Sequence, residues 1–162
     1  MAATTLVVTS KTFKEGELIP SSAAHGAVGG DNRSPQLSWT AGPEGTKSYA
    51  VTCWDPDAPT TVGFTHWVRF DIPADQTSLD EGAGSEPGVH GLSDWGESTY
   101  GGMAPPAGDS PHHYQFTVYA LDEEVARCTN GPNALITSRA PDDLKAFCHA
   151  LTTAFAATRP SL

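Results

Sequence analysis

A rigid polar turn at the end of an apolar strand is the feature that most constrains how this chain can fold. Residues 47–54 alternate in character as a β-strand does. The sequence Asp-Pro-Asp-Ala-Pro at 55–59 cannot continue that strand, because each proline lacks an N–H group and fixes φ. We therefore expect Asp55 and Asp57 to be held at the end of a core strand, where polar side chains usually form a functional site.

Two further segments, 66–72 and 114–121, show the same alternation. The residues expected on one face are Tyr49, Val51 and Cys53 in the first strand, His66, Val68, Phe70 and Ile72 in the second, and Tyr114, Phe116 and Val118 in the third. Between them, residues 74–99 are weakly patterned and predict a long surface excursion, a kind of loop that usually carries function or conceals a short strand.

A helix is predicted only after Ala140. Pro141 suits the first helical position, and the apolar residues that follow have a spacing near 3.6. One helix at the end of a strand-rich chain predicts a mainly β protein with a helix laid beside its sheets. At 162 residues, we expect a single domain over 1–162.

Charge and composition exclude several classes of partner. The net charge of −10 and the absence of a Lys/Arg cluster argue against binding nucleic acid. No apolar run approaches the ~20 residues of a membrane span, and the first ten residues do not resemble a signal peptide. The three cysteines form no C-x-x-C pair, so we expect reduced thiols and a cytoplasmic protein.

The polar turn is one of five motifs that occur together in this sequence. They are Ser34-Pro-x-Leu-x-Trp39, Asp55-Pro-Asp-Ala-Pro59, His66-Trp67, Tyr100-Gly-Gly-x-x-Pro-Pro106, and Pro111-His-x-Tyr114 followed by Val118-Tyr-Ala-Leu-Asp122. In this order they resemble the phosphatidylethanolamine-binding protein (PEBP) family, and within it the bacterial and archaeal Raf-kinase-inhibitor-like group. The resemblance extends roughly from Phe13 to Phe155.

This resemblance implies a PEBP-like fold, in which a large antiparallel sheet packs on a smaller sheet, with peripheral helices that include one near the C-terminus. It also implies a small cavity that binds phosphate, carboxylate or phosphoethanolamine-like groups. The residues that match the family's cavity are Asp55, Asp57, His66, Pro106, His112 and Tyr114. Prokaryotic relatives often pair as homodimers, which leaves the oligomeric state of this chain open.

The residue types of this cavity suit an anion. His66 and His112 can supply N–H donors, and Tyr114 an O–H donor. The aspartates cannot face an anion without a cost in free energy, so we expect each to accept a proton from an imidazole or to bind an amine. His113 stands where the family commonly has arginine, which removes a permanent positive charge and predicts weaker or more pH-dependent anion binding.

The leading hypothesis is a binding protein without turnover, a small anionic ligand as its partner, and no cofactor. A second hypothesis is an isomerase, cyclase or lyase that uses His66, His112 and Asp55 for acid–base catalysis. A third is inhibition of a kinase or protease by surface contact, as some family members do. A metal site of Asp55, Asp57, His66 and His112 is disfavoured, because no His pair has helical spacing. Ser-His-Asp hydrolysis is disfavoured by the lack of a G-x-S-x-G motif.

Overall fold

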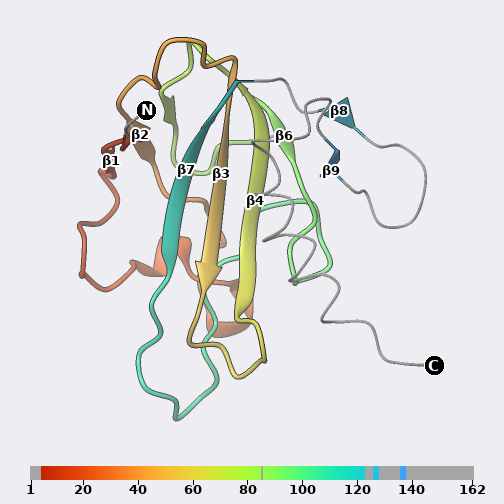
Figure 1. The fold of residues 1–162 in the computed structure, drawn as a ribbon. Helices are drawn as coiled ribbons and strands as arrows, with labels where there is room; N and C mark the ends of the chain where they lie inside the picture. Colours follow the sequence, from red (N-terminus) through yellow and green to blue (C-terminus); the bar gives the residue numbers. More distant parts are fainter. Residues whose placement is uncertain (1–4, 85, 123–125, 128–135, 138–162) are drawn as a thin grey trace, which may run out of the picture.

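The computed structural model describes residues 5–84, 86–122, 126–127 and 136–137. Its centre is a four-stranded antiparallel sheet in the order β6-β4-β3-β7 (Figure 1). These strands are β3 (Ser48–Asp55), β4 (Phe64–Pro73), β6 (Val89–His90) and β7 (Gln115–Leu121). A three-stranded antiparallel sheet has the order β1-β2-β5, from β1 (Val8–Thr9), β2 (Leu37–Trp39) and β5 (Ser78–Leu79). The predicted mainly β fold with a larger and a smaller antiparallel sheet is confirmed.

Smaller elements complete the described part of the chain. Two short 3-10 helices, η1 (Ser21–Ala23) and η2 (Gly26–Val28), lie in the segment that joins β1 to β2. Strands β8 (Ala126–Arg127) and β9 (Ile136–Thr137) pair with each other. The helix predicted after Ala140 lies outside the described residues. Within the described residues, no helix is long and apolar enough to cross a membrane.

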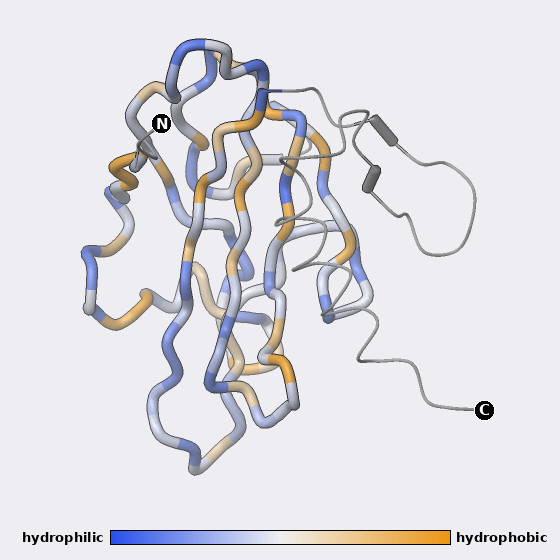
Figure 2. The backbone as a smooth tube through the Cα atoms, viewed as in Figure 1, coloured by the Kyte–Doolittle hydropathy of each residue, from blue (hydrophilic) through white to orange (hydrophobic). Residues whose placement is uncertain are grey.

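The main hydrophobic core lies between the two sheets. Its buried members include Leu37 and Trp39 of β2, Leu79 of β5, Tyr49, Val51 and Cys53 of β3, Trp67 and Ile72 of β4, and Val118 of β7. The predicted inward face of β3 is therefore correct. Figure 2 shows the alternation of hydrophobic and hydrophilic residues along these strands. Burying each large side chain of this kind stabilises the fold by about 1.5–3 kcal/mol.

Strand β4 departs from a regular strand at two bulges. Its pairing with β3 shifts by one residue between Tyr49 and Val51, close to Asp71, whose φ is +54°. As a result Ile72 packs into the main core, whereas Val68 and Phe70 pack in a separate cluster with Ala50. The prediction that one face of this strand continues from Val68 to Ile72 was wrong, because an inserted residue reverses the alternation.

The second bulge lies at His66. Cys53 pairs with Trp67 and Trp54 pairs with Thr65, so His66 is the extra residue of β4. A bulge bends its strand and re-aims a side chain, and bulges are common next to functional sites. Here the bulge allows His66 to share the side of the sheet on which Trp67 is buried, instead of the opposite side that strict alternation requires.

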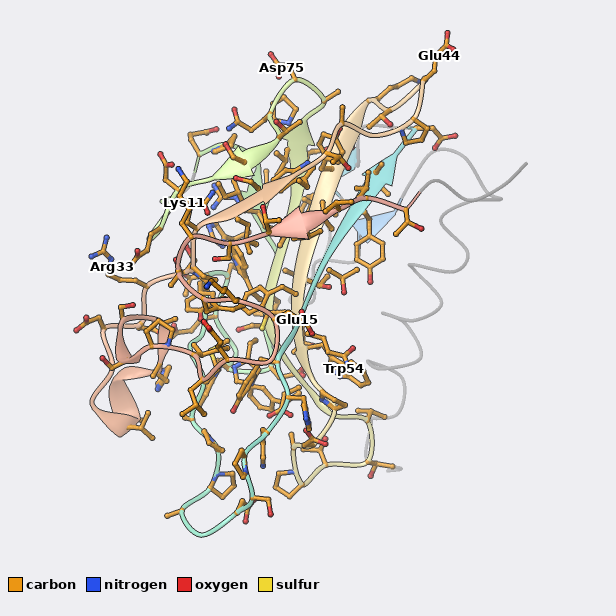
Figure 3. All side chains as sticks on the ribbon, turned by 90° about the vertical axis from the view of Figure 1, so that its left-hand side faces the viewer. Lys11, Glu15, Arg33, Glu44, Trp54 and Asp75 are labelled. Carbon is orange, nitrogen blue, oxygen red and sulfur yellow. The ribbon has the colours of Figure 1, made fainter. Side chains whose placement is uncertain are left out.

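The weakly patterned segment 74–99 is only in part a surface excursion. It contributes β5 and β6, and Gly91 and Ser93 are buried within it. The turns at one end of the large sheet are polar, and Figure 3 shows Glu44 and Asp75 projecting from them. The opposite end, where β3 finishes at Asp55, carries the polar cluster described next.

Candidate functional site

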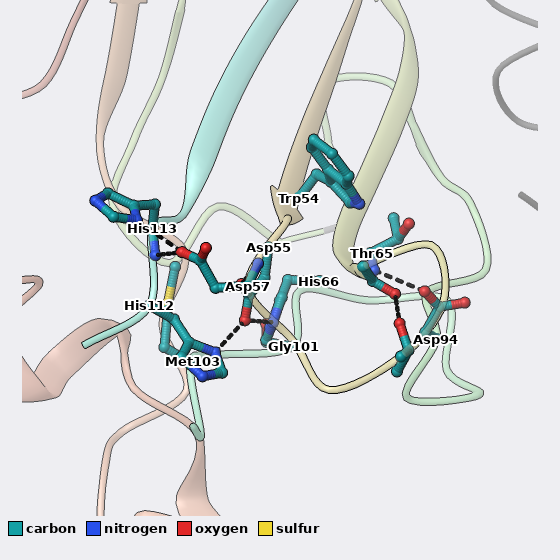
Figure 4. A network of polar contacts seen from close by, with 12 residues as sticks. Trp54, Asp55, Asp57, Thr65, His66, Asp94, Gly101, Met103, His112 and His113 are labelled. Carbon is teal, nitrogen blue, oxygen red and sulfur yellow. Dashed lines mark hydrogen bonds and ion pairs between the residues drawn. The ribbon is translucent and has the colours of Figure 1, made fainter. Parts of the chain in front are cut away.

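The polar cluster forms where β3 ends, where β4 begins and where the segment leading into β7 passes both of them (Figure 4). The structure brings together five of the six residues predicted from the sequence: Asp55, Asp57, His66, His112 and Tyr114. Pro106 is different. It is exposed, and its carbonyl accepts a hydrogen bond from the Asp109 N–H in the turn that precedes His112.

Asp55 is the centre of the cluster and is only 3% exposed. Its Oδ1 accepts a hydrogen bond of 2.9 Å from the backbone N–H of Asp57, a local turn that Pro56 favours by fixing φ. Its Oδ2 lies 2.8 Å from Nδ1 of His112 and 4.0 Å from Nε2 of His66. One carboxylate oxygen therefore faces both imidazoles.

The ring of His66 is buried, and its environment determines where its proton lies. Its Nδ1 lies 3.0 Å from the carbonyl oxygen of Gly101 and 3.1 Å from that of Gly102. Carbonyl oxygens can only accept, so Nδ1 carries hydrogen and Nε2 faces Asp55. The indole N–H of Trp95 lies 3.4 Å from the same Nδ1, and with hydrogen on Nδ1 this is a contact and not a hydrogen bond. Burial lowers the pKa of His66, although the carbonyls and Asp55 oppose this effect.

Asn32 holds the backbone segment that carries these two carbonyls. Its Oδ1 accepts a 2.7 Å hydrogen bond from the Gly102 N–H, and its Nδ2 donates to the Tyr100 carbonyl at 3.4 Å. Asn32 thus forms hydrogen bonds with the residues on either side of Gly101. In return, the Gly101 N–H donates to the His66 carbonyl at 3.0 Å.

Close packing explains the two consecutive glycines. A Cβ atom on Gly101 would lie 2.0 Å from the Trp95 indole, and one on Gly102 would lie 2.4 Å from the backbone nitrogen of His25. Neither contact is physically allowed without movement of the neighbour. The Tyr-Gly-Gly motif therefore lets the backbone approach His66 closely.

The excursion 74–99 also reaches the site. Asp94 bonds the backbone of Thr65 in both directions, as an acceptor at 2.6 Å and through its own N–H at 2.9 Å. Trp95 stacks on His25 with ring centres 4.1 Å apart and meets the ring of Phe64 edge to face. These contacts hold the residues next to the bulge of β4 in place.

His112 has the opposite electrostatic environment, although its side chain is only 5% exposed. Its Nδ1–H donates to Asp55, and its Nε2 lies 3.5 Å from Oδ2 of Asp109. The hydrogen bond to Asp55 raises the pKa of His112, with a smaller contribution from Asp109, and burial opposes the change. Of the two imidazoles, His112 is therefore the one that more readily carries a positive charge.

His113 and Asp57 form an outer pair at the rim. The backbone N–H of His113 donates to Asp57 Oδ2 at 2.7 Å, and its ring Nδ1 lies 2.7 Å from the same oxygen. The side chains are 81% and 41% exposed, respectively. These hydrogen bonds, the backbone one first, lower the pKa of Asp57. The residue in the arginine position thus contacts a carboxylate of the site.

Tyr114 completes the cluster. Its ring meets that of His66 edge to face, with ring centres 5.2 Å apart. Its hydroxyl oxygen is buried and has no hydrogen-bond partner among the described residues. Burial, followed by the charge of Asp55, raises the pKa of Tyr114, so this hydroxyl keeps its proton and remains a donor. A buried hydroxyl without a partner is uncommon and calls for an explanation.

A groove of about 1140 Å³ opens beside the cluster. Its lining includes His112, His113 and Tyr114, together with Pro105 and not Pro106. The segment around Phe13 and Lys14 also lines it. Within the described residues, no group of three His, Cys, Asp or Glu side chains is arranged to hold a metal ion.

Sequence reasoning missed Asn32, Asp94, Trp95 and Asp109. Trp95 and Asp94 lie in a weakly patterned segment, but a lone Trp among glycines and acids was a usable signal. The signal at Asn32 was weaker. Asparagine tolerates the positive φ of +54° that this residue adopts in a glycine-rich loop. Asp109 belongs to none of the five motifs, and its contact with His112 depends on the turn at Pro106.

Comparison with known proteins gives a consistent result. The sequence profile of the family described as "Phosphatidylethanolamine-binding protein" matches residues 9–160. The chain is 45% identical to the UPF0098 protein YbcL of Escherichia coli over 139 residues, which cover 80% of this chain and 76% of YbcL. It is 43% identical to the UPF0098 protein YbhB of the same organism over 123 residues, which cover 71% of this chain and 77% of YbhB.

Two solved structures agree. The crystal structure of E. coli YbcL, described as a new member of the mammalian PEBP family, superimposes with a TM-score of 0.70 at 46% identity, covering 74% of this chain and 78% of that one. A putative PEBP homologue from Chlamydia trachomatis gives a TM-score of 0.66 at 33% identity, covering 75% of this chain and 78% of that one.

Proposed function

Because this chain belongs to the phosphatidylethanolamine-binding protein family, we propose that it binds a small phosphate- or carboxylate-bearing ligand at the Asp55/His66/His112/Tyr114 cluster. The observation that carries the proposal is the hydroxyl of Tyr114, which is buried beside two imidazoles without a partner. A ligand oxygen in reach of this hydroxyl and of His112 would satisfy both donors. Pro106 and the outer Asp57 would contribute to the rim.

Electrostatics supports His112 as the principal donor. Its contact with Asp55 favours the imidazolium form, and a hydrogen bond from a charged donor to an anion is about twice as strong as a neutral one. Since His113 is exposed and bonded to Asp57, it supplies less attraction than the arginine that the family commonly has. Affinity is therefore expected to depend on pH.

Isothermal titration with phosphate, phosphoethanolamine and acetate at pH 5.5 and pH 8 tests the proposal. We expect binding at pH 5.5 that weakens at pH 8 and is lost in the His112→Ala variant. The matched control is His113→Ala, which removes an exposed imidazole beside the same site and should retain most of the affinity. Unchanged anion affinity in both His66→Ala and His112→Ala would refute the assignment of the site.

A second candidate function is acid–base catalysis, and the contrast between the two imidazoles favours it. His66 has a lowered pKa and a ring nitrogen free to accept a proton, whereas His112 has a raised pKa and can donate one. In many enzymes, two titratable groups whose pKa values are shifted in opposite directions serve as the acid and the base. A metabolite screen that yields a bell-shaped pH–rate profile, lost in His66→Ala and in His112→Ala, would support turnover.

A cytoplasmic location, pairing as a homodimer and inhibition of a kinase or protease stay predictions from the sequence and its resemblance. Size-exclusion chromatography with light scattering tests directly whether the protein is a homodimer.

A further inference from the structure

The inner side of the site consists of acceptors, on the side chains of His66 and Asp55, which are each 4% exposed and lie behind the residues that line the groove. His66 Nδ1 is committed as a donor to the carbonyls of Gly101 and Gly102, so the neutral ring offers only a lone pair at Nε2. Asn32 holds this arrangement through the Gly102 N–H. The nearest charged group, Oδ2 of Asp55 at 4.0 Å, is an acceptor as well.

His112 and Tyr114, by contrast, present donors. His112 gives its Nδ1–H to Asp55, which leaves Nε2–H of the imidazolium as the group that can reach a ligand in place of Asp109. The hydroxyl of Tyr114 has no partner among the described residues and can donate too. The charged or titratable groups that face His112 are Asp55, Asp57, Asp109 and Tyr114, and those that face His66 are Asp55, Asp94 and Tyr114.

The charge of the surroundings disfavours a doubly charged anion. Three carboxylates, those of Asp55, Asp57 and Asp109, belong to the cluster and its rim. No Lys or Arg takes part in the described contacts of the cluster, and Lys14 in the groove is accompanied by Glu15 and Glu17. A bare dianion would place oxygen acceptors against the His66 lone pair and Asp55, which leaves buried acceptors facing one another at a cost in free energy.

We propose that the site selects an anion that carries its own proton, a phosphate monoester in its singly charged form, over an anion of the same shape without that proton. This inference rests on the proposed function. The ester's P–OH donates to His66 Nε2 or to Asp55, while its ionised oxygens accept from His112 and Tyr114. One ligand of this kind matches both the acceptors and the donors of the site. A site built to accept a hydrogen bond from a ligand rejects an analogue that lacks the donor group.

Methyl phosphate and methyl sulfate form a matched pair of probes. At pH 5.5, below the second pKa of ~6 of a phosphate monoester, both carry one negative charge and have the same shape, and they differ in the central atom and in one acidic hydrogen. We expect isothermal titration at this pH to show methyl phosphate binding about tenfold or more tightly than methyl sulfate. At pH 8 methyl phosphate loses the proton and should bind at most as well as methyl sulfate.

The possible outcomes separate the two proposals. Equal affinity for the two probes at pH 5.5 overturns the proton requirement and leaves anion binding intact. Absence of binding by either probe, and by phosphate and acetate, overturns both. The His66→Gln variant, whose amide can donate, should raise the affinity for methyl sulfate relative to methyl phosphate, and an unchanged ratio in a folded variant counts against the inference.

Nuclear magnetic resonance on the unaltered protein provides an independent check. In protein with ¹⁵N-labelled histidine at neutral pH, His66 should show a protonated Nδ1 and an unprotonated Nε2. Addition of methyl phosphate at pH 5.5 should move the Nε2 resonance, whereas methyl sulfate should leave it in place. A protonated Nε2 in the free protein at neutral pH would overturn the inference.

Discussion

Two of the Asp–His pairs in the site use the same types of side chain in opposite ways. The inner one, Asp55 with His66, is buried, and His66 is held chiefly by backbone carbonyls. The outer one, Asp57 with His113, is largely exposed and is joined by direct hydrogen bonds at the rim. The pKa of His66 is lowered by burial, and the pKa of Asp57 is lowered by its bonds.

The contrast shows that residue type alone does not assign a role. In the inner arrangement, the carbonyls of Gly101 and Gly102 determine which nitrogen of His66 carries the hydrogen, and so which donors and acceptors a ligand meets. In the outer arrangement, water can replace each partner, so the pair is worth little to stability. Variants on the two sides should therefore differ in the size of their effects.

The largest effect is expected from Gly102→Ala on the inner side. Its new methyl group would lie 2.4 Å from the His25 nitrogen and 2.5 Å from the Ala24 carbonyl carbon. We expect a loss of about 2–3 kcal/mol in the free energy of unfolding, measured in urea. Gly26→Ala is the matched control, since nothing lies within 4 Å of its added Cβ. An equal loss in both variants would mean that close packing does not define the inner side.

Asp55→Asn should act on both stability and titration. The hydrogen bond to Asp55 is the main cause of the raised pKa of His112, so this pKa should fall in the variant, as measured by NMR titration. A histidine whose pKa is raised on folding contributes its full stabilisation below the pKa of the unfolded state, ~6.5. This stabilisation is lost as the pH rises through the pKa of the folded state. We therefore expect the variant to lose about 1–3 kcal/mol at pH 5.5 and less at pH 8. A loss that grows toward pH 8 would contradict this linkage.

Asn32→Gly tests whether the inner carbonyls need their support. Glycine accepts the φ of +54°, so the variant removes the side chain without adding backbone strain. We expect a loss of about 1–2 kcal/mol in the free energy of unfolding and a mixture of tautomers at His66 in ¹⁵N spectra. Asn32→Asp keeps the acceptor for the Gly102 N–H and should retain the single tautomer.

The smallest effect is expected on the outer side. His113→Ala should leave the urea midpoint at pH 7 unchanged, because its side chain is 81% exposed. His113→Arg restores a permanent charge and should raise anion affinity at pH 8 by about fivefold, since a unit charge near 4 Å in water contributes about 1 kcal/mol. A large loss of stability in His113→Ala would erase the distinction between the two sides.

Much of the fold could be predicted from local patterns. The alternation at Tyr49, Val51 and Cys53 places these residues in the core, because successive side chains of a strand point to opposite faces. The same rule failed in β4, where the bulges at His66 and Asp71 leave no periodic trace in the sequence. The convergence of Asp55, His66 and His112 was predicted from their motifs, and the supports Asn32 and Trp95 were not.

The sequence by itself determined the mainly β class, the family and the rigid Asp-Pro-Asp turn, because these depend on local stereochemistry and on motifs that adjoin in the chain. Tertiary structure decided where the protons lie. His66 meets carbonyls 35 and 36 residues away, His112 meets a carboxylate 57 residues away, and Asn32 reaches Gly102 across 70 residues. A proton's position follows from the acceptors around it, and the folded chain assembles those acceptors from distant segments.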